Sequence, residues 1–141
     1  MNYVILEKAN KVKTLAVDFD GTIVKANKVS PLKTKLLPGV KKGMEQFKKD
    51  GWTLIIYTAR PNNELKEIKE FLKKNDIPFD YINENPLQPQ PNPGKLYCDV
   101  MLDDKVVTFK NWDSAYNDVI NQRKKLDKVR PKEKKVLERY G

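Results

Sequence analysis

Short apolar runs and stretches with helical periodicity alternate along this chain. Short apolar runs bounded by turn residues predict buried strands. Apolar residues that recur every three or four positions predict helices. The predicted strands cover residues 15–17, 52–57, 79–82 and 100–102, and the predicted helices cover 38–51, 62–75 and a segment that begins at Ser114.

The ends of the predicted helices carry signals of their own. Gly51 is a good stop just past the first helix. Asn62 or Asn63 is a suitable N-cap for the second helix and Asp113 for the last, because short polar side chains can accept the first unpaired amide N–H groups.

The elements follow one another as strand, helix, strand, helix, strand, strand, helix. This order favours an α/β fold in which right-handed crossovers join parallel strands. We therefore expect a three-layer, Rossmann-like parallel sheet with helices on both faces. Residues 1–13 suggest a short edge strand and turn. The segment 83–94, with four prolines in its last nine residues, predicts a stiff, extended loop, because proline fixes φ and lacks an amide donor.

Acidic and hydroxyl side chains follow three of the predicted strands: Asp18 and Asp20, Thr58, and Asp103 and Asp104. In open parallel sheets, ligands bind beyond the carboxyl ends of the strands. Carboxylates placed close together resist joint ionisation unless a cation neutralises them. Hard oxygen ligands near a phosphate are the usual environment of Mg²⁺. A plainer interpretation is that Asp18 and Asp20 only cap a turn at Gly21.

The composition indicates the class of protein and excludes some kinds of catalytic and metal site. The chain has 141 residues, of which 39% are hydrophobic and 33% charged, as expected for one globular domain. No apolar run approaches the ~18 residues of a membrane span. The N-terminus lacks a signal-peptide pattern, so we expect an intracellular, cytoplasmic protein that does not bind membranes. With one cysteine and no histidine, an internal disulfide and histidine-dependent nucleophiles or metal ligands are excluded.

Positive charge is concentrated near the C-terminus. Residues 123–141 contain nine Lys/Arg and three Asp/Glu, so they carry +6 of the net +9. We therefore divide the chain into a domain over 1–122 and a basic helical tail over 123–141. Such a tail can hold nucleic acid, although a solvated helix face of mixed charge is the plainer interpretation.

The residues at the strand ends resemble the four signature motifs of the haloacid dehalogenase superfamily of phosphotransferases. The segment Asp18-Phe-Asp-Gly-Thr22 resembles the first motif, Thr58 the second, Lys95 the third and Asp103-Asp104 the fourth. The resemblance covers about residues 14–120. It is strongest to small phage and bacterial members without a large cap domain, including the phosphatase part of phage polynucleotide kinases.

The resemblance implies a role for each matching residue. Asp18 would be the nucleophile that forms an aspartyl-phosphate, and Asp20 the general acid and base. Asp18, the Asp20 backbone carbonyl and Asp103 would bind Mg²⁺, with Asp104 as a further ligand or an orienting residue. The residues that would contact the phosphorylated substrate are Gly21, Thr22, Thr58, Ala59, Arg60 and Lys95.

Several alternatives stay open on the sequence. Arg60 could touch the substrate or only pair with a carboxylate, and Lys95 could be a surface lysine. The favoured activity is Mg²⁺-dependent phosphomonoester hydrolysis, on nucleotides or nucleic-acid ends among other substrates. A nucleic-acid-binding module with a vestigial catalytic fold is a second hypothesis. Phosphoryl transfer to an acceptor other than water is a third.

Overall fold

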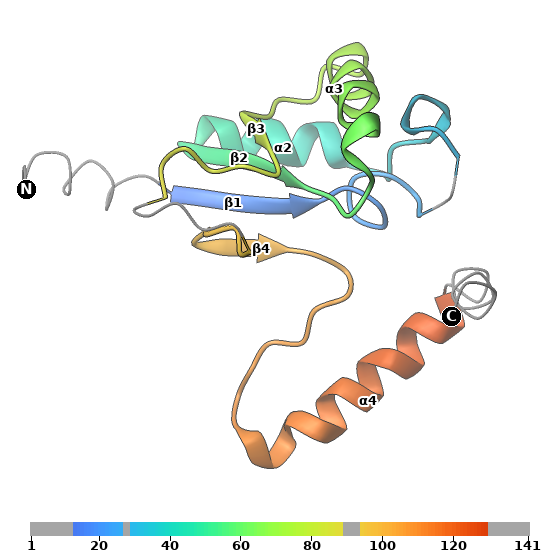
Figure 1. Ribbon diagram of the computed structural model, residues 1–141, viewed down its shortest axis with the longest axis vertical. Helices are drawn as coiled ribbons and strands as arrows, with labels where there is room; N and C mark the ends of the chain where they lie inside the picture. The colour runs from blue at the N-terminus through green and yellow to red at the C-terminus, as the bar shows by residue number, and fades with distance from the viewer. Residues whose placement is uncertain (1–12, 27–28, 89–93, 130–141) are drawn as a thin grey trace, which may run out of the picture. The chain divides into compact units, whose positions relative to one another are not determined.

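The computed structural model describes residues 13–26, 29–88 and 94–129 of the chain. The chain divides between Asp103 and Asp104 into two compact units, and both are drawn in Figure 1. The edge strand and turn predicted for residues 1–13 lie outside the described ranges except for Lys13, which begins β1. The predicted basic tail lies outside them from residue 130 onward.

A parallel four-stranded sheet forms the first unit. Its strands are β1 (Lys13–Asp18), β2 (Trp52–Tyr57), β3 (Tyr81–Ile82) and β4 (Val100–Leu102). They lie in the order β3-β2-β1-β4, and every pair of neighbours is parallel. The predicted Rossmann-like α/β sheet is thus confirmed.

Two helices of the first unit cover one face of this sheet. The helix α2 (Val40–Lys49) joins β1 to β2, and α3 (Leu65–Lys74) joins β2 to β3. Both crossovers step across the sheet in the same direction, so right-handed connections place both helices on the same face, as Figure 1 shows. Helical cover of the other face stays a prediction.

The core lies between β1, β2 and these two helices. The fully buried large side chains include Phe19, Ile23, Leu54, Ile55, Ile56, Ile68 and Leu72. Nearly continuous apolar sequence in β1 and β2 is typical of strands that are buried on both faces. The core therefore holds the two central strands, which carry candidate site residues at their carboxyl ends.

The strand β4 departs from the sequence prediction. Its three residues were expected to be buried, yet Val100, Met101 and Leu102 are 50%, 36% and 44% exposed. The reason is the position of β4 at the edge of the sheet, where it pairs with β1. The candidate site residues therefore follow two central strands, β1 and β2, and one edge strand, β4.

The helix caps also differ from those expected. Neither Asn62 nor Asn63 caps α3, because the chain enters that helix through a 3₁₀ turn over Asn62–Glu64. The helix α4 (Trp112–Val129) belongs to the second unit and begins two residues earlier than predicted. Its cap is Asn111, whose Oδ1 accepts the Ser114 N–H at 3.0 Å.

The helix α4 crosses the predicted boundary between the domain and the basic tail. It continues through the predicted boundary between residues 122 and 123. The division of the chain into a domain and a basic tail at that boundary stays a prediction. Within the described ranges, no helix combines the length and the apolar character that a bilayer crossing needs.

A cluster of hydrogen bonds fixes how β4 lies against β1. The Asp99 carboxylate accepts the Thr14 N–H at 2.8 Å and the Thr14 hydroxyl at 2.9 Å. In return, the Asp99 N–H donates to the Thr14 carbonyl oxygen at 3.0 Å. The Tyr97 hydroxyl donates to the other carboxylate oxygen at 3.1 Å. These bonds set the register of the two strands at their amino ends.

We predict that Asp99→Asn lowers the free energy of unfolding near neutral pH by about 1 kcal/mol, since it weakens charge-assisted hydrogen bonds at a partly exposed site. The Thr14 backbone N–H holds the pKa of Asp99 below its ordinary value. The ionised carboxylate therefore stabilises the fold above the unfolded pKa of about 3.9, and this contribution is lost as pH falls through the folded pKa.

Urea unfolding at neutral and acid pH measures this effect. The difference between wild type and Asp99→Asn should shrink in acid, and Asp50→Asn, at the exposed end of α2, should show little difference at either pH. A difference that grew in acid would contradict the assignment.

Candidate active site at the carboxyl edge of the sheet

The strand register brings three of the predicted residues to one edge of the sheet. Asp18 ends β1 and pairs with Tyr57, the last residue of β2, so Thr58 follows β2 one residue beyond the level of Asp18. On the other side, Val17 pairs with Leu102, so Asp103 follows β4 in step with Asp18. Neighbouring parallel strands lie about 4.8 Å apart, so Asp18 lies at the middle of this edge, between Thr58 on one side and Asp103 on the other.

Asp18, Asp103 and Asp104 form a carboxylate cluster. Each offers an oxygen, and the three oxygens lie within 4.8 Å of one another. Octahedral Mg²⁺ holds oxygens at about 2.1 Å, which sets neighbouring ligands about 3 Å apart and opposite ligands about 4.2 Å apart. The all-oxygen donor set suits Mg²⁺, and small side-chain movements would bring the three oxygens to one ion, because their limit of 4.8 Å is only slightly wider than an octahedral site.

Asp20 is placed differently. Its carboxylate is outside this cluster and pairs with Arg60, whose Nε donates to Oδ2 at 2.7 Å and whose Nη2 donates to Oδ1 at 2.8 Å. The hydrogen bond from Arg60 to Asp20 raises the pKa of the guanidinium, against the opposing effect of burial. Of the two roles that the sequence left open for Arg60, pairing with a carboxylate is the one observed. The metal-binding role of the Asp20 carbonyl stays a prediction.

The chain turns immediately after β1, so Asp18 ends the strand and Asp20 lies in the turn. Gly21 has a φ of +89°, a conformation that glycine adopts without strain. The Gly21 N–H donates to the Val24 carbonyl at 2.8 Å, and the Thr22 N–H donates to the Phe19 carbonyl at 3.4 Å. Both amides are thus used within the turn. The buried Thr22 hydroxyl has no hydrogen-bond partner among the described residues.

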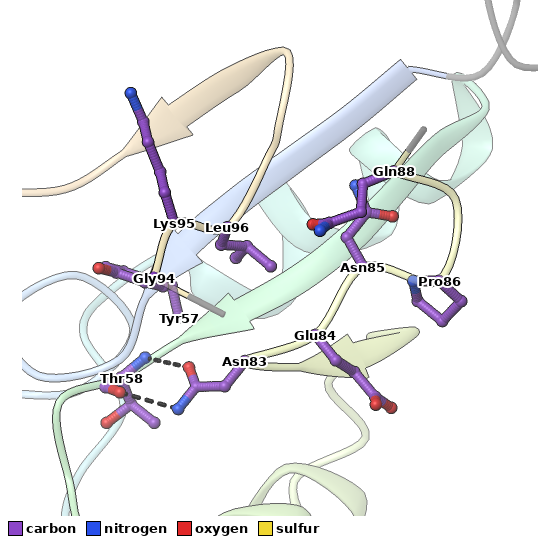
Figure 2. A pocket seen from close by; sticks show the side chains of 10 residues that line it. All are labelled: Tyr57, Thr58, Asn83, Glu84, Asn85, Pro86, Gln88, Gly94, Lys95 and Leu96. Atoms are coloured by element: carbon purple, nitrogen blue, oxygen red, sulfur yellow. Dashed lines mark hydrogen bonds between the residues drawn. The ribbon is translucent and has the colours of Figure 1, made fainter. Parts of the chain in front are cut away.

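Thr58 is held by a residue that the sequence analysis missed. Asn83, just after β3, accepts the Thr58 N–H on Oδ1 at 2.8 Å and donates from Nδ2 to the Thr58 carbonyl at 2.9 Å (Figure 2). Asn83 has a φ of +53°, which Asn tolerates better than most residues. A polar residue directly after a third parallel strand is the signal that could have identified it.

The Thr58 side chain is oriented by a second bond. Its Oγ1 accepts the Arg60 N–H at 3.1 Å, which closes a tight turn with Ala59 exposed at its apex. Thr58 itself is only 6% exposed. Because the oxygen accepts within the turn, the hydroxyl hydrogen can donate to a ligand.

A pocket of about 590 Å³ adjoins Thr58. Its lining comes from the end of β2, the segment after β3 and the segment before β4 (Figure 2): Tyr57, Thr58, Asn83, Glu84, Asn85, Pro86, Gln88, Gly94, Lys95 and Leu96. Lys95 is exposed, and in Figure 2 its side chain extends away from Thr58. The structure therefore places Lys95 at the predicted edge of the sheet, and its role as a phosphate ligand stays a prediction.

The connections around this edge are short. Residues 19–39 join β1 to α2, and residues 58–64 join β2 to α3. In the described part of these connections there is no further domain, as predicted for a chain without a large cap. The edge that carries Asp18 and Thr58 is therefore not covered by an inserted domain.

Comparison with known proteins shows the fold. No family model and no curated protein matches the sequence. A conserved protein from Bacteroides thetaiotaomicron has a similar structure, with a TM-score of 0.57 and 25% identity over 79% of this chain and 93% of that one. A chain of the Pnkp1/Rnl/Hen1 RNA repair complex has a TM-score of 0.51 and 20% identity, over 79% of this chain and 38% of that one.

A weaker likeness is to D,D-heptose 1.7-bisphosphate phosphatase from B. bronchiseptica, complexed with magnesium and phosphate. Its TM-score is 0.44 at 21% identity, over 60% of this chain and 54% of that one. The first two likenesses establish an α/β fold of the kind that the resemblance to the haloacid dehalogenase superfamily implied.

We predict that Asp103→Asn weakens Mg²⁺ binding by more than about tenfold, equivalent to about 1.4 kcal/mol, because it removes a charged ligand from the cluster. Isothermal titration with MgCl₂ measures the affinity without any substrate. Asp50→Asn is the matched control and should bind like the wild type. Equal affinities for Asp103→Asn and the wild type would show that the cluster is not the metal site.

Proposed function

We propose that this chain, which has a haloacid dehalogenase-like fold, is a Mg²⁺-dependent phosphomonoester hydrolase that works through an aspartyl-phosphate. The observation that carries the proposal is the meeting of three carboxylates, Asp18, Asp103 and Asp104, at the sheet edge to which Thr58 belongs. Such a cluster supports the binding of a divalent cation beside a phosphoryl group, because Mg²⁺ is usually held by carboxylates together with substrate phosphates.

Asp18 is the nucleophile in this proposal. A carboxylate that attacks phosphorus replaces one difficult displacement with two easier ones. Mg²⁺, held by Asp18, Asp103 and Asp104, would neutralise negative charge and so favour the approach of a carboxylate to a phosphate. One Asp18 oxygen would bind the cation, and the other would form the bond to phosphorus.

Thr58 and Lys95 bind the phosphoryl oxygens. The Thr58 hydroxyl donates a hydrogen bond, since its oxygen already accepts the Arg60 N–H. Asn83 holds the Thr58 backbone in place on both its N–H and its carbonyl. The Lys95 ammonium adds positive charge where charge develops in the transition state. Electrostatic stabilisation of this kind depends on donors that are fixed before the reaction begins.

Asp20 acts as the general acid and base. As an acid it protonates the leaving oxygen of the ester, and as a base it takes a proton from the water that hydrolyses the aspartyl-phosphate. Because no inserted domain covers the site in the described connections, bulky phosphorylated substrates are compatible with it. Transfer to an acceptor other than water would use the same first step.

We predict that Asp18→Asn lowers turnover of p-nitrophenyl phosphate by about 10³-fold or more, a loss of about 4 kcal/mol in transition-state stabilisation. An amide cannot form the covalent intermediate. Phosphate release with Mg²⁺, and its loss with EDTA, measures the activity of wild type and variant. Asp76→Asn, on an exposed turn after α3, should keep full activity. Wild-type turnover by Asp18→Asn would rule out this nucleophile.

The basic C-terminal segment supports a nucleic-acid partner as a second proposal. Residues 123–141 carry +6 of the net charge, and clustered Lys and Arg bind the phosphate backbone by releasing counterions. A binding module with a vestigial catalytic fold would bind oligonucleotides and hydrolyse no ester. An enzyme that acts on nucleic-acid ends would do both.

Replacing Arg130, Lys132, Lys134, Lys135 and Arg139 by Gln should weaken binding to a single-stranded oligonucleotide. The slope of log K against log salt should flatten by about 0.7 for each phosphate group that no longer pairs with a cationic side chain. Fluorescence anisotropy over a range of salt concentrations measures both changes. Unchanged affinity and slope would remove nucleic acid as a partner of this segment.

A further inference from the structure

The Arg60 guanidinium is enclosed by protein groups. Its side chain is 9% exposed, which is unusual for a charged residue at a sheet edge. Both oxygens of the Asp20 carboxylate accept from it, on Nε and Nη2, at 2.7 and 2.8 Å. A two-bond fork of this kind fixes the plane of the carboxylate as well as its distance.

Further contacts hold the guanidinium itself. Its Nη1 donates to the Val29 carbonyl at 2.9 Å, and Glu64 lies 3.7 Å from the same nitrogen. The guanidinium also lies over the ring of Phe19, 5.7 Å from its centroid, and Phe19 is fully buried. Phe19 stands between the two aspartates in sequence, so Arg60 is anchored to the segment that links them.

We infer that Arg60 is a positioning residue for Asp20: its fork holds the Asp20 carboxylate at a fixed orientation relative to Asp18. Three of the five guanidinium N–H groups already donate to Asp20 and Val29. This arrangement favours an action through Asp20 over direct binding of the phosphoryl group. The inference rests on the proposed function, because it concerns the proton transfers of that reaction.

Two steps need the orientation of Asp20. In the first, an Asp18 oxygen bonds to phosphorus while the bond from phosphorus to the ester oxygen breaks. The electron pair goes to that oxygen, which takes the proton of the Asp20 carboxyl group. In the second, water bonds to phosphorus and gives a proton to Asp20, and the bond between phosphorus and Asp18 breaks. A misoriented Asp20 slows the first step most when the leaving oxygen is strongly basic.

This dependence on the leaving group separates a positioning role from the alternatives. The nitrophenolate of p-nitrophenyl phosphate leaves without much help from an acid. The alkoxide of benzyl phosphate has a similar size and needs its proton. Arg60→Lys keeps the charge but loses the planar fork, because an ammonium group is a point charge. Asp20→Asn removes the acid itself.

The experiment measures kcat and KM for both esters, with Mg²⁺, in the wild type, Arg60→Lys, Asp20→Asn and the double variant. Arg60→Lys should lower kcat on benzyl phosphate by about tenfold or more and kcat on p-nitrophenyl phosphate by less than about threefold. The double variant should be no slower than Asp20→Asn, because Arg60 acts through Asp20. Lys41→Arg, in an exposed pair with Glu45, is the matched control and should change kcat on neither ester.

Other outcomes overturn the inference. A rise in KM on both esters with kcat unchanged would make Arg60 a direct phosphate ligand. Equal losses of kcat on both esters, or losses additive with those of Asp20→Asn, would make its role only structural. If Arg60→Lys does not fold, by circular dichroism, Arg60→Gln replaces it, and failure of both to fold also assigns a structural role. A wild type that releases phosphate from neither ester would overturn the proposed function as well.

Discussion

The site depends on the register between β1 and β4. Asp99 is bound to Thr14 at the amino ends of these strands, and the sequence separation of 85 between these residues is the same as that between Asp18 and Asp103. Fixing one pair therefore fixes the other. A shift of one residue would turn the side chain of Asp103 to the opposite face of the sheet. Hydrogen bonds at one end of the strands thus determine which carboxylates meet at the other end.

The carboxylates near this edge of the sheet have two kinds of electrostatic environment. Asp20 pairs with Arg60, a fixed cation that the chain supplies. Asp18, Asp103 and Asp104 instead gather their oxygens at a spacing that suits a divalent ion. Asp18 ends β1, whereas Asp20 lies in the turn that follows the strand. Two aspartates that are close in sequence thereby acquire different partners and, in our proposal, different tasks.

Much of this arrangement could be predicted from the sequence. The apolar runs located the four strands of the described sheet. The acidic residues that follow two of them predicted the cluster of Asp18, Asp103 and Asp104, because the carboxyl ends of parallel strands share one edge. Asn83 was missed although it directly follows a predicted strand, because its left-handed backbone and its bonds to Thr58 form only in the folded chain. The exposure of β4 was also missed, because an apolar run does not distinguish an edge strand from a central one.

The proposed reaction requires that Asp18 accept a phosphoryl group beside a cation that it shares with Asp103. The decisive test is a crystal structure of the full chain grown with Mg²⁺ and beryllium trifluoride, which mimics a phosphoryl group on a carboxylate. We expect one cation bound by Asp18 and Asp103, with beryllium bonded to the second Asp18 oxygen and the Thr58 hydroxyl donating to a fluoride. Beryllium trifluoride on another residue, or a cation bound away from Asp103, would contradict the proposed reaction.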